Sequence, residues 1–205
     1  MRFSKQEKEA FSKGCQRVAG VDEAGRGAWA GPIVAAAVAV SPDMNFSRPN
    51  IRDSKTLSKN QRSEMFGFIS KYFNYGVGVV GAEMIDEMGI QWANREAMIR
   101  AIDQLSITPN FVFIDGRGFS FDFPYQNIVD GDATIFSISA ASIVAKVVRD
   151  EMMKKLDEVY CGYNFCAHKG YGTREHSEKI RRFGICPLHR RSYAPIARFA
   201  KMLYV

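Results

Sequence analysis

Acidic side chains at the ends of two apolar runs are the residues of this sequence best suited to catalysis. Asp22 and Glu23 end a Val- and Ala-rich run that starts at residue 17, and Asp115 follows the run of residues 111–114. Because ligands of α/β proteins gather outside the carboxyl ends of strands, we expect these acids to share one site. Asp132, just ahead of a long helical pattern, is a fourth candidate.

Clustered carboxylates of this kind predict a metal site. They repel one another unless a cation lies between them, and hard oxygen donors in this number suit Mg²⁺ or Mn²⁺. Two such ions can hold both the attacking water and the leaving oxygen of a phosphodiester, which makes phosphodiester hydrolysis the expected reaction. There is one geometric objection: neighbours on a regular strand point to opposite faces, so Asp22 and Glu23 converge only if the strand is bulged or ends there.

Glycines and an arginine follow the acid pair at once, in the turn Gly25-Arg26-Gly27. Glycine allows a ligand to approach the backbone closely, and the guanidinium fork of arginine matches a phosphate. An ordinary tight turn is the alternative reading, but its position beside Asp22 and Glu23 favours substrate binding.

Other polar residues are candidates for contact with a nucleic-acid backbone. Ser142 and Lys146 are spaced i, i+4 near the start of the long helical pattern, where backbone N–H groups favour anions; a solvated polar stripe is the alternative. Further candidates are Lys55 on a loop, Tyr171 between two glycines, which suits stacking on a sugar or base, and Arg190 and Arg191 near the C-terminus.

Charge is distributed unevenly along the 205 residues. Residues 1–145 hold 15 Lys and Arg against 16 Asp and Glu, whereas residues 146–205 hold 13 against 6. An acidic first part and a basic last quarter suit a polyanion held beside metal-binding carboxylates, so we expect a nucleic-acid substrate. A solvated basic surface would give the same composition.

Composition places the chain among ordinary soluble proteins, with 46% hydrophobic and 24% charged residues. No apolar run reaches the ~18–20 residues of a membrane helix, and the first residues lack the apolar core of a signal peptide. We therefore expect a cytoplasmic protein, a monomer without membrane association. The four cysteines are too scattered for a disulfide framework, and Cys161, Cys166 and His168 match a zinc site only weakly.

Hydrophobic periodicity predicts the elements that position these residues. Strands are expected at residues 17–23, 33–40, 73–80 and 111–114, with a brief strand or loop at 127–132. Helices are expected at 55–71, at 82–105 with a break at Gly89, at 137–160, 174–183 and 195–203. The order predicts an α/β fold, a mixed sheet flanked by helices, with residues 1–160 as the catalytic domain and residues 161–205 as a basic helical C-terminal appendage packed on it.

Six blocks in a fixed order carry a family resemblance over nearly the whole chain. VDEAGRG, DSKTLS, FIDG, ISAASIVAKVVRD, HKGYGT and HRRSYAP together resemble bacterial ribonuclease HII. The resemblance implies a ribonuclease H-like fold, two Mg²⁺ or Mn²⁺ ions, cleavage of the RNA strand of RNA–DNA hybrids, and incision at single ribonucleotides embedded in duplex DNA.

The same resemblance assigns roles to individual residues. It implies that Asp22, Glu23 and Asp115 are metal ligands and Asp132 the fourth acid, that Gly25, Arg26 and Gly27 read the ribonucleotide 2′-hydroxyl, and that Tyr171 stacks on the sugar. The chain departs from the family pattern at Ala28-Trp29, where Pro-Leu is usual, and at Asp130, where Lys is common.

Two other functions fit the residues. One is another two-metal nuclease of the same broad fold, such as a junction resolvase, which would cut junctions without a ribonucleotide. The other is a catalytically silent hybrid-binding module, which would show salt-sensitive binding and no metal-dependent turnover. The retained acids argue against a simple binder, because clustered carboxylates do not help to bind phosphate.

Overall fold

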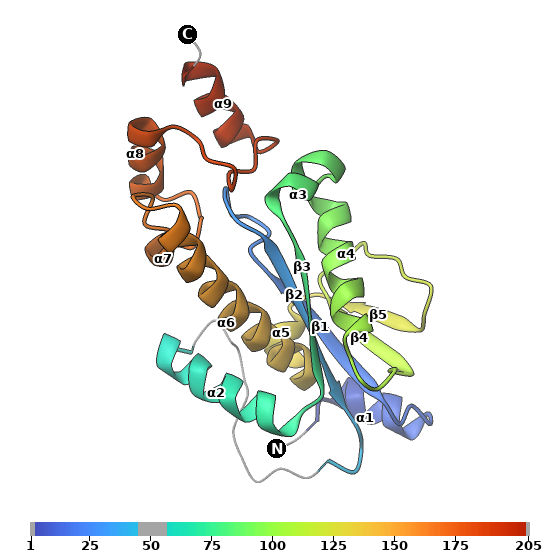
Figure 1. Ribbon diagram of the computed structural model, residues 1–205. Coiled ribbons are helices and arrows are strands. Elements are labelled where there is room, and N and C mark those ends of the chain that lie inside the picture. The colour runs from blue at the N-terminus through green and yellow to red at the C-terminus, as the bar shows by residue number, and fades with distance from the viewer. Residues whose placement is uncertain (1–2, 45–56, 204–205) are drawn as a thin grey trace.

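A five-stranded mixed sheet organises the protein, with strand order β3-β2-β1-β4-β5 (Figure 1). The computed structural model describes residues 3–44 and 57–203. The strands are β1 (Val18–Ala24), β2 (Ile33–Val40), β3 (Tyr75–Val80), β4 (Phe111–Asp115) and β5 (Tyr125–Ile128). The helices are α1 (Lys5–Ser12), α2 (Lys59–Tyr72), α3 (Ala82–Met88), α4 (Ile90–Asp103), α5 (Gly131–Thr134), α6 (Phe136–Val159), α7 (Phe165–His168), α8 (Arg174–Phe183) and α9 (Ala194–Leu203).

Strand directions bring the predicted acids to one edge of the sheet. β1 runs antiparallel to β2 and parallel to β4, and β4 runs parallel to β5. Val21 pairs with Ile114, so Asp22 and Asp115 follow immediately in neighbouring strands. The parallel strands β1 and β4 therefore end side by side, with their acids at the same edge.

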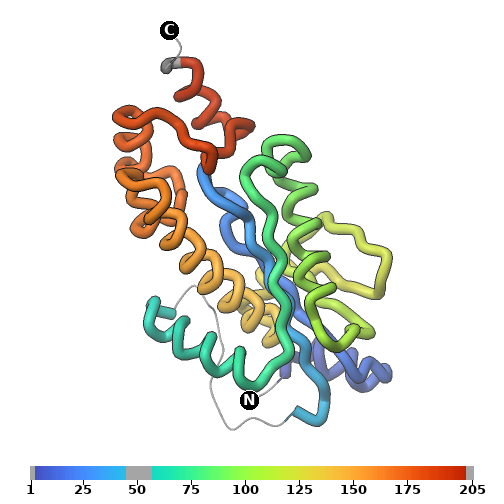
Figure 2. Tube along the Cα trace, in the orientation of Figure 1, coloured from blue at the N-terminus to red at the C-terminus, as the bar shows by residue number. Residues whose placement is uncertain are grey.

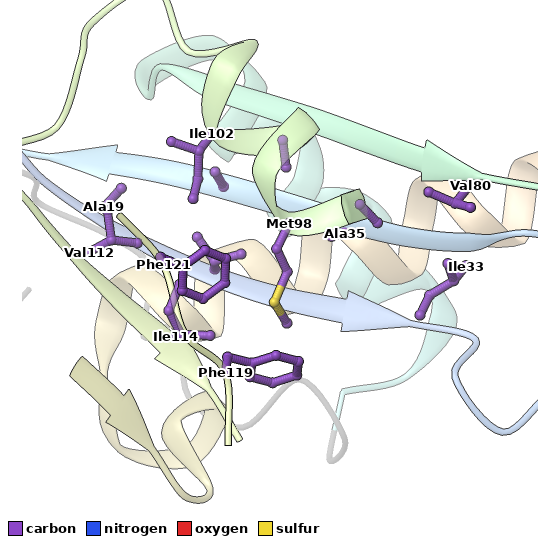
Figure 3. Close-up of a cluster of buried hydrophobic side chains, with 14 of the residues drawn as sticks. Ala19, Ile33, Ala35, Val80, Met98, Ile102, Val112, Ile114, Phe119 and Phe121 are labelled. Atoms are coloured by element: carbon purple, nitrogen blue, oxygen red, sulfur yellow. The ribbon is translucent and has the colours of Figure 1, made fainter. Parts of the chain in front are cut away.

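Helices cover both faces of the sheet, α6 on one and α4 on the other (Figure 1). The α6 face needs a glycine at Gly20, because a Cβ there would overlap the backbone of Ser137 and Ile138. On the other face, Met98 of α4 points into a cluster of buried side chains that includes Phe119 and Phe121 (Figure 3). Apolar burial on both faces fixes β1, and with it the position of the acids.

The C-terminal residues gather at the end of the sheet where residues 25–31 turn back toward β2 (Figure 2). Ala30 forms an isolated β-bridge with His189, and the N–H of Trp29 donates to the carbonyl of Gly170 at 2.8 Å. The division of the chain into domains at residue 160 stays a prediction. What the structure describes is close contact between residues after α6 and the turn that follows β1.

Most predicted elements are confirmed, and local chemistry explains their ends. Ser58 forms a capping box with Gln61 at the start of α2, and Gly89 separates α3 from α4 with φ of 83°. The helix α1 lies ahead of β1, within the first 14 residues of the chain. β5 lies at Tyr125–Ile128 and not at 127–132, and the one-turn helix α7 lies between the helices expected at 137–160 and 174–183. In the described part of the chain, no helix is long and apolar enough to cross a membrane.

Candidate active site

Asp22 and Glu23 lie on opposite faces of the sheet at the end of β1. β1 pairs with β2 residue by residue up to Ala24, so no bulge turns the two carboxylates to one side. Asp22 faces α6, where Ser142 hydrogen-bonds to it, and Glu23 faces α4, where Asn94 lies beside it. The strand is therefore not bulged at the acid pair. It stays regular, and the two carboxylates lie on opposite sides of its end.

Asp115 connects the two acids electrostatically. Burial and the neighbouring charges of Glu23 and Asp115 together raise the pKa of Asp22 to about 8, although Ser142 and Lys146 oppose the shift. Burial also raises the pKa of Glu23, with Asp115 adding to the effect and Arg26 opposing it. The guanidinium of Arg26 lies 3.9 Å from the Glu23 carboxylate. The acids therefore form one cluster of interacting carboxylates.

Asp132 lies in the short helix α5, whose first residue contacts Asp115. The N–H of Gly131 donates to the Asp115 Oδ1 at 2.7 Å, which ties the start of α5 to the end of β4. Asp132 is only 2% exposed, whereas Asp130 is exposed and has a left-handed backbone with φ of 53°. The buried Asp132 is thus better placed than Asp130 to join the acids.

The donor chemistry of the cluster fits a hard divalent cation. Within the described residues, no three Asp, Glu, His or Cys side chains already have the arrangement of a metal site. Asp22 Oδ1 instead accepts a hydrogen bond from the N–H of Glu23 at 2.7 Å. Burial first, and then the repulsion between neighbouring carboxylates, disfavours the ionised forms of Asp22 and Glu23, and a bound cation would offset both effects. Oxygen-only donors suit Mg²⁺ or Mn²⁺.

Ser142 and Lys146 lie beside Asp22 on the same side of α6. Ser142 is completely buried, and the Lys146 ammonium donates to its hydroxyl at 2.5 Å. Both residues lower the pKa of Asp22, so they stabilise its ionised form. The structure corrects the prediction for Ser142: its hydroxyl is buried at the acid and is not on a surface that a phosphate backbone could reach. Lys146 is half-buried next to the site.

The two glycines of the turn have different surroundings. Gly25 is buried, has φ of +91°, and lies so close to Arg149 that a Cβ would overlap the guanidinium. Gly27 is exposed, and apart from its own atoms and those of Arg26 and Ala28 no protein atom lies within 4 Å of the position of a Cβ. Gly25 is therefore required by the packing of the protein itself, whereas Gly27 leaves open space for a ligand.

Tyr171 lies over the same arginine. Its side chain is 43% exposed, and the Arg149 guanidinium lies 5.3 Å from the centre of its ring. The next residue, Gly172, packs against Trp29 so closely that a Cβ would overlap the indole. Arg149 thus contacts both Gly25 and the ring of Tyr171. The turn and Tyr171, both predicted to bind substrate, therefore lie on either side of one arginine.

The remaining basic candidates for phosphate contact differ in their exposure to solvent. Arg190 is fully buried, and its guanidinium donates to the carbonyls of Gly31 and Arg26. This corrects the prediction of a phosphate contact, because those donors are already in use inside the protein. Arg191 is exposed. Lys55 lies outside the described residues.

Three histidines form a buried cluster away from the acids. The rings of His168 and His176 stack with centres 4.3 Å apart, and Nε2 of His176 lies 3.1 Å from Nε2 of His189. Burial lowers the pKa of His176 and of His189 to about 4, so both rings are neutral at pH 7. The cluster supports Tyr171, whose carbonyl contacts His176 Nδ1 at 2.9 Å.

Sequence reasoning missed two residues of the site, Asn94 and Arg149. Asn94 is fully buried on α4 and lowers the pKa of Glu23. Arg149 is 2% exposed and lies three turns into α6. Asn94 is a polar residue between Ala93 and Ala97, and this position on an apolar side of the helix was the one sign in the sequence that it is buried. Arg149 looked like one of many basic residues of the last quarter, and only its neighbours in space identify it.

Comparison with known proteins gives one consistent result. Residues 19–196 match the family model described as Ribonuclease HII. A ribonuclease HII of Geobacillus kaustophilus is 45% identical over 196 residues, which cover 95% of this chain and 75% of that protein. The crystal structure of ribonuclease H2 from Pyrococcus horikoshii has a TM-score of 0.78 at 26% identity, covering 92% of this chain and 99% of that one. The structure of Bst-RNase HIII in complex with Mn²⁺ shares the fold, with a TM-score of 0.67 at 19% identity, over 94% of this chain and 72% of that one.

Proposed function

The chain belongs to the ribonuclease HII family, and from this premise we propose that it incises duplex DNA at single embedded ribonucleotides in addition to cutting RNA–DNA hybrids. As a type 2 ribonuclease H it is an endonuclease that acts on RNA–DNA hybrids. The proposal adds the single-ribonucleotide substrate, products with 5′-phosphate and 3′-hydroxyl ends, and roles for the residues of the site.

The observation that carries the proposal is the position of the Gly25-Arg26-Gly27 turn directly after the acids. A 2′-hydroxyl distinguishes RNA from DNA at a single nucleotide, and reading it requires close approach to the backbone. The exposed Gly27 offers that approach, and Glu23 is only four residues before it in the chain. One continuous segment can thus contact the sugar and supply a carboxylate for the reaction beside it.

Asp22, Glu23, Asp115 and Asp132 are the residues that we expect to hold two Mg²⁺ or Mn²⁺ ions. Such ions, when bound, activate the attacking water and stabilise the leaving 3′-oxygen. Two features of the chain support this: β1 and β4 end together, and the N–H of Gly131, the residue before Asp132, donates to Asp115. Ser142 and Lys146 favour the ionised form of Asp22, which is the form that binds a cation.

Substrate contacts come from the residues around this cluster. Arg26 is exposed and suits the phosphate beside the ribonucleotide, and the exposed ring of Tyr171 suits stacking on the sugar. Lys146, Arg191 and, from outside the described residues, Lys55 are the remaining candidates for phosphate contact. We expect a cytoplasmic monomer that acts on nucleic acid.

The test is cleavage of a synthetic duplex that carries one ribonucleotide in a labelled strand. Incubation with Mg²⁺ or Mn²⁺ should give a single cut next to the ribonucleotide, and an all-DNA duplex of the same sequence should stay intact. Asp115→Asn should abolish the cut. Cleavage of the all-DNA duplex, or of a four-way junction without a ribonucleotide, would refute the proposal.

A further inference from the structure

Two buried arginines hold the backbone of the segment that carries the sugar-reading turn. Arg190 donates from Nε and Nη2 to the carbonyl of Gly31, at 3.0 and 2.9 Å, and from Nη1 to the carbonyl of Arg26 at 3.0 Å. Arg149 approaches from α6 and donates from Nε to the carbonyl of Pro32 at 3.0 Å. The segment between β1 and β2 is therefore fixed through its carbonyl groups.

Tyr193 adds a second donor to the carbonyl at the centre of the turn. Its hydroxyl donates to the Arg26 carbonyl at 2.6 Å and accepts a hydrogen bond from Nη1 of Arg190 at 3.0 Å. The Arg26 carbonyl, Arg190 and Tyr193 thus form a closed triangle of hydrogen bonds. The Arg26 carbonyl is held by two different side chains, whereas the Gly31 carbonyl receives both of its hydrogen bonds from Arg190.

The loop that carries this pair is itself anchored. The Asp86 carboxylate, on α3, accepts hydrogen bonds from the N–H of Arg191 at 2.7 Å and from the N–H and hydroxyl of Ser192 at 2.8 and 2.6 Å. The N–H of Arg190 also donates to the carbonyl of Trp29 at 2.8 Å. Arg190 and Tyr193 are therefore rigid supports and not mobile surface side chains.

The planar peptide bond links the direction of the Arg26 carbonyl to the direction of the Gly27 N–H. The carbonyl of Arg26 and the N–H of Gly27 belong to one planar trans peptide unit, so they point in opposite directions. Since the carbonyl points toward Arg190 and Tyr193, the N–H of Gly27 points away from them. Gly27 is exposed with open space at its Cα, so a ligand can reach this donor.

Stability alone does not explain why an arginine is buried at position 190. Burial lowers the pKa of Arg190, although Tyr193, Tyr171 and Asp86 oppose the shift, and well-packed apolar side chains often stabilise a fold as well as buried charges do. What the guanidinium fork provides is a fixed direction for the carbonyls that it binds.

We propose that Arg190 and Tyr193 are positioning residues for ribonucleotide recognition: by holding the Arg26 carbonyl they aim the N–H of Gly27 at the 2′-hydroxyl. This inference rests on the proposed function, and it extends that function to residues that do not touch the substrate.

The experiment compares Tyr193→Phe with the unaltered protein. Dissociation constants are measured by fluorescence anisotropy for a duplex with one ribonucleotide and for the all-DNA duplex of the same sequence. Ca²⁺ replaces Mg²⁺, and the duplex is checked to remain uncut. Loss of one neutral hydrogen bond to the turn should reduce the preference for the ribonucleotide duplex by about twofold to tenfold.

A matched control comes from the same region. The hydroxyl of Tyr163 donates to the carbonyl of Gly184 at 2.9 Å, away from the turn, so Tyr163→Phe should leave the preference unchanged. Arg190→Met should reduce it further than Tyr193→Phe, in protein that still melts cooperatively. If that variant does not fold, Tyr193→Phe alone decides.

Two results would overturn the inference. One is an unchanged preference in Tyr193→Phe; the other is an equal weakening for both duplexes, which indicates a general structural role. Absence of any preference in the unaltered protein is a different outcome, because it refutes the proposed function before the variants are compared.

Discussion

Alanine at the two glycines of the turn should separate folding from recognition. At Gly25, alanine must adopt φ of +91°, which costs about 1–2 kcal/mol for a residue with a side chain. Its Cβ would also displace the guanidinium of Arg149 from the carbonyl of Pro32, a hydrogen bond of a charged donor that contributes about 1.5–3 kcal/mol. Together these effects predict a loss of about 3–5 kcal/mol in the free energy of unfolding.

At Gly27 the same substitution meets open space. No atom beyond the adjoining residues lies within 4 Å of the new Cβ, and the backbone is outside the left-handed region, so the free energy of unfolding should change by less than about 0.5 kcal/mol. The added methyl group would nevertheless stand where we propose that the sugar approaches the turn. We expect cleavage at a single ribonucleotide to fall by at least about tenfold, which corresponds to about 1.4 kcal/mol.

The assay combines thermal unfolding with cleavage of the single-ribonucleotide duplex. For a chain of this size, 1 kcal/mol shifts Tm by about 2–4 °C, so Gly25→Ala should melt about 6–20 °C lower and Gly27→Ala within about 2 °C of the unaltered protein. Wild-type cleavage by Gly27→Ala would refute close approach of the sugar to this turn. A wild-type Tm for Gly25→Ala would refute the packing of Arg149 against it.

Further predictions concern Asp22, the histidine cluster and Tyr171. Asp22→Asn should abolish metal-dependent cleavage yet raise the free energy of unfolding of the metal-free protein at pH 8, because it removes a buried carboxylate whose pKa is raised; urea unfolding at several pH values measures this. His176 and His189 have lowered pKa values, so the unfolded chain binds more protons at these residues, and their contribution to stability should fall by about 1–3 kcal/mol as pH drops from 6.5 to about 4. The raised pKa values of Asp22 and Glu23 act in the opposite direction, so urea unfolding is measured in the variant Asp22→Asn, Glu23→Gln, where a flat profile in that window would contradict the prediction. Tyr171→Ala should weaken binding of the ribonucleotide duplex by about 1–3 kcal/mol, whereas Tyr171→Phe should retain most of the affinity, as titration in Ca²⁺ can show.

Local patterns were enough to predict the main elements and the acids. The periodicity of apolar residues and the position of Gly89 predicted most of the strands and helices that the structure shows. Position at the ends of apolar runs was enough to select Asp22 and Asp115 as neighbours, because parallel strands end at the same edge of a sheet. These features depend on residues close together in the sequence, or on a general rule of sheet topology.

Other features depend on residues that are far apart in the chain. The sequence could not show that Glu23 faces α4 while Asp22 faces α6, because that requires the regular pairing of β1 up to Ala24. It also could not show that Arg190 is buried against Gly31, a contact that spans 159 positions.

A basic residue near the C-terminus has the same local character whether it meets a phosphate or a carbonyl group. Side-chain chemistry and spacing therefore determined which groups are candidates for the site. Tertiary packing decided which of them are exposed to the substrate and which hold the others in place, because burial is a property of the surroundings and not of the residue.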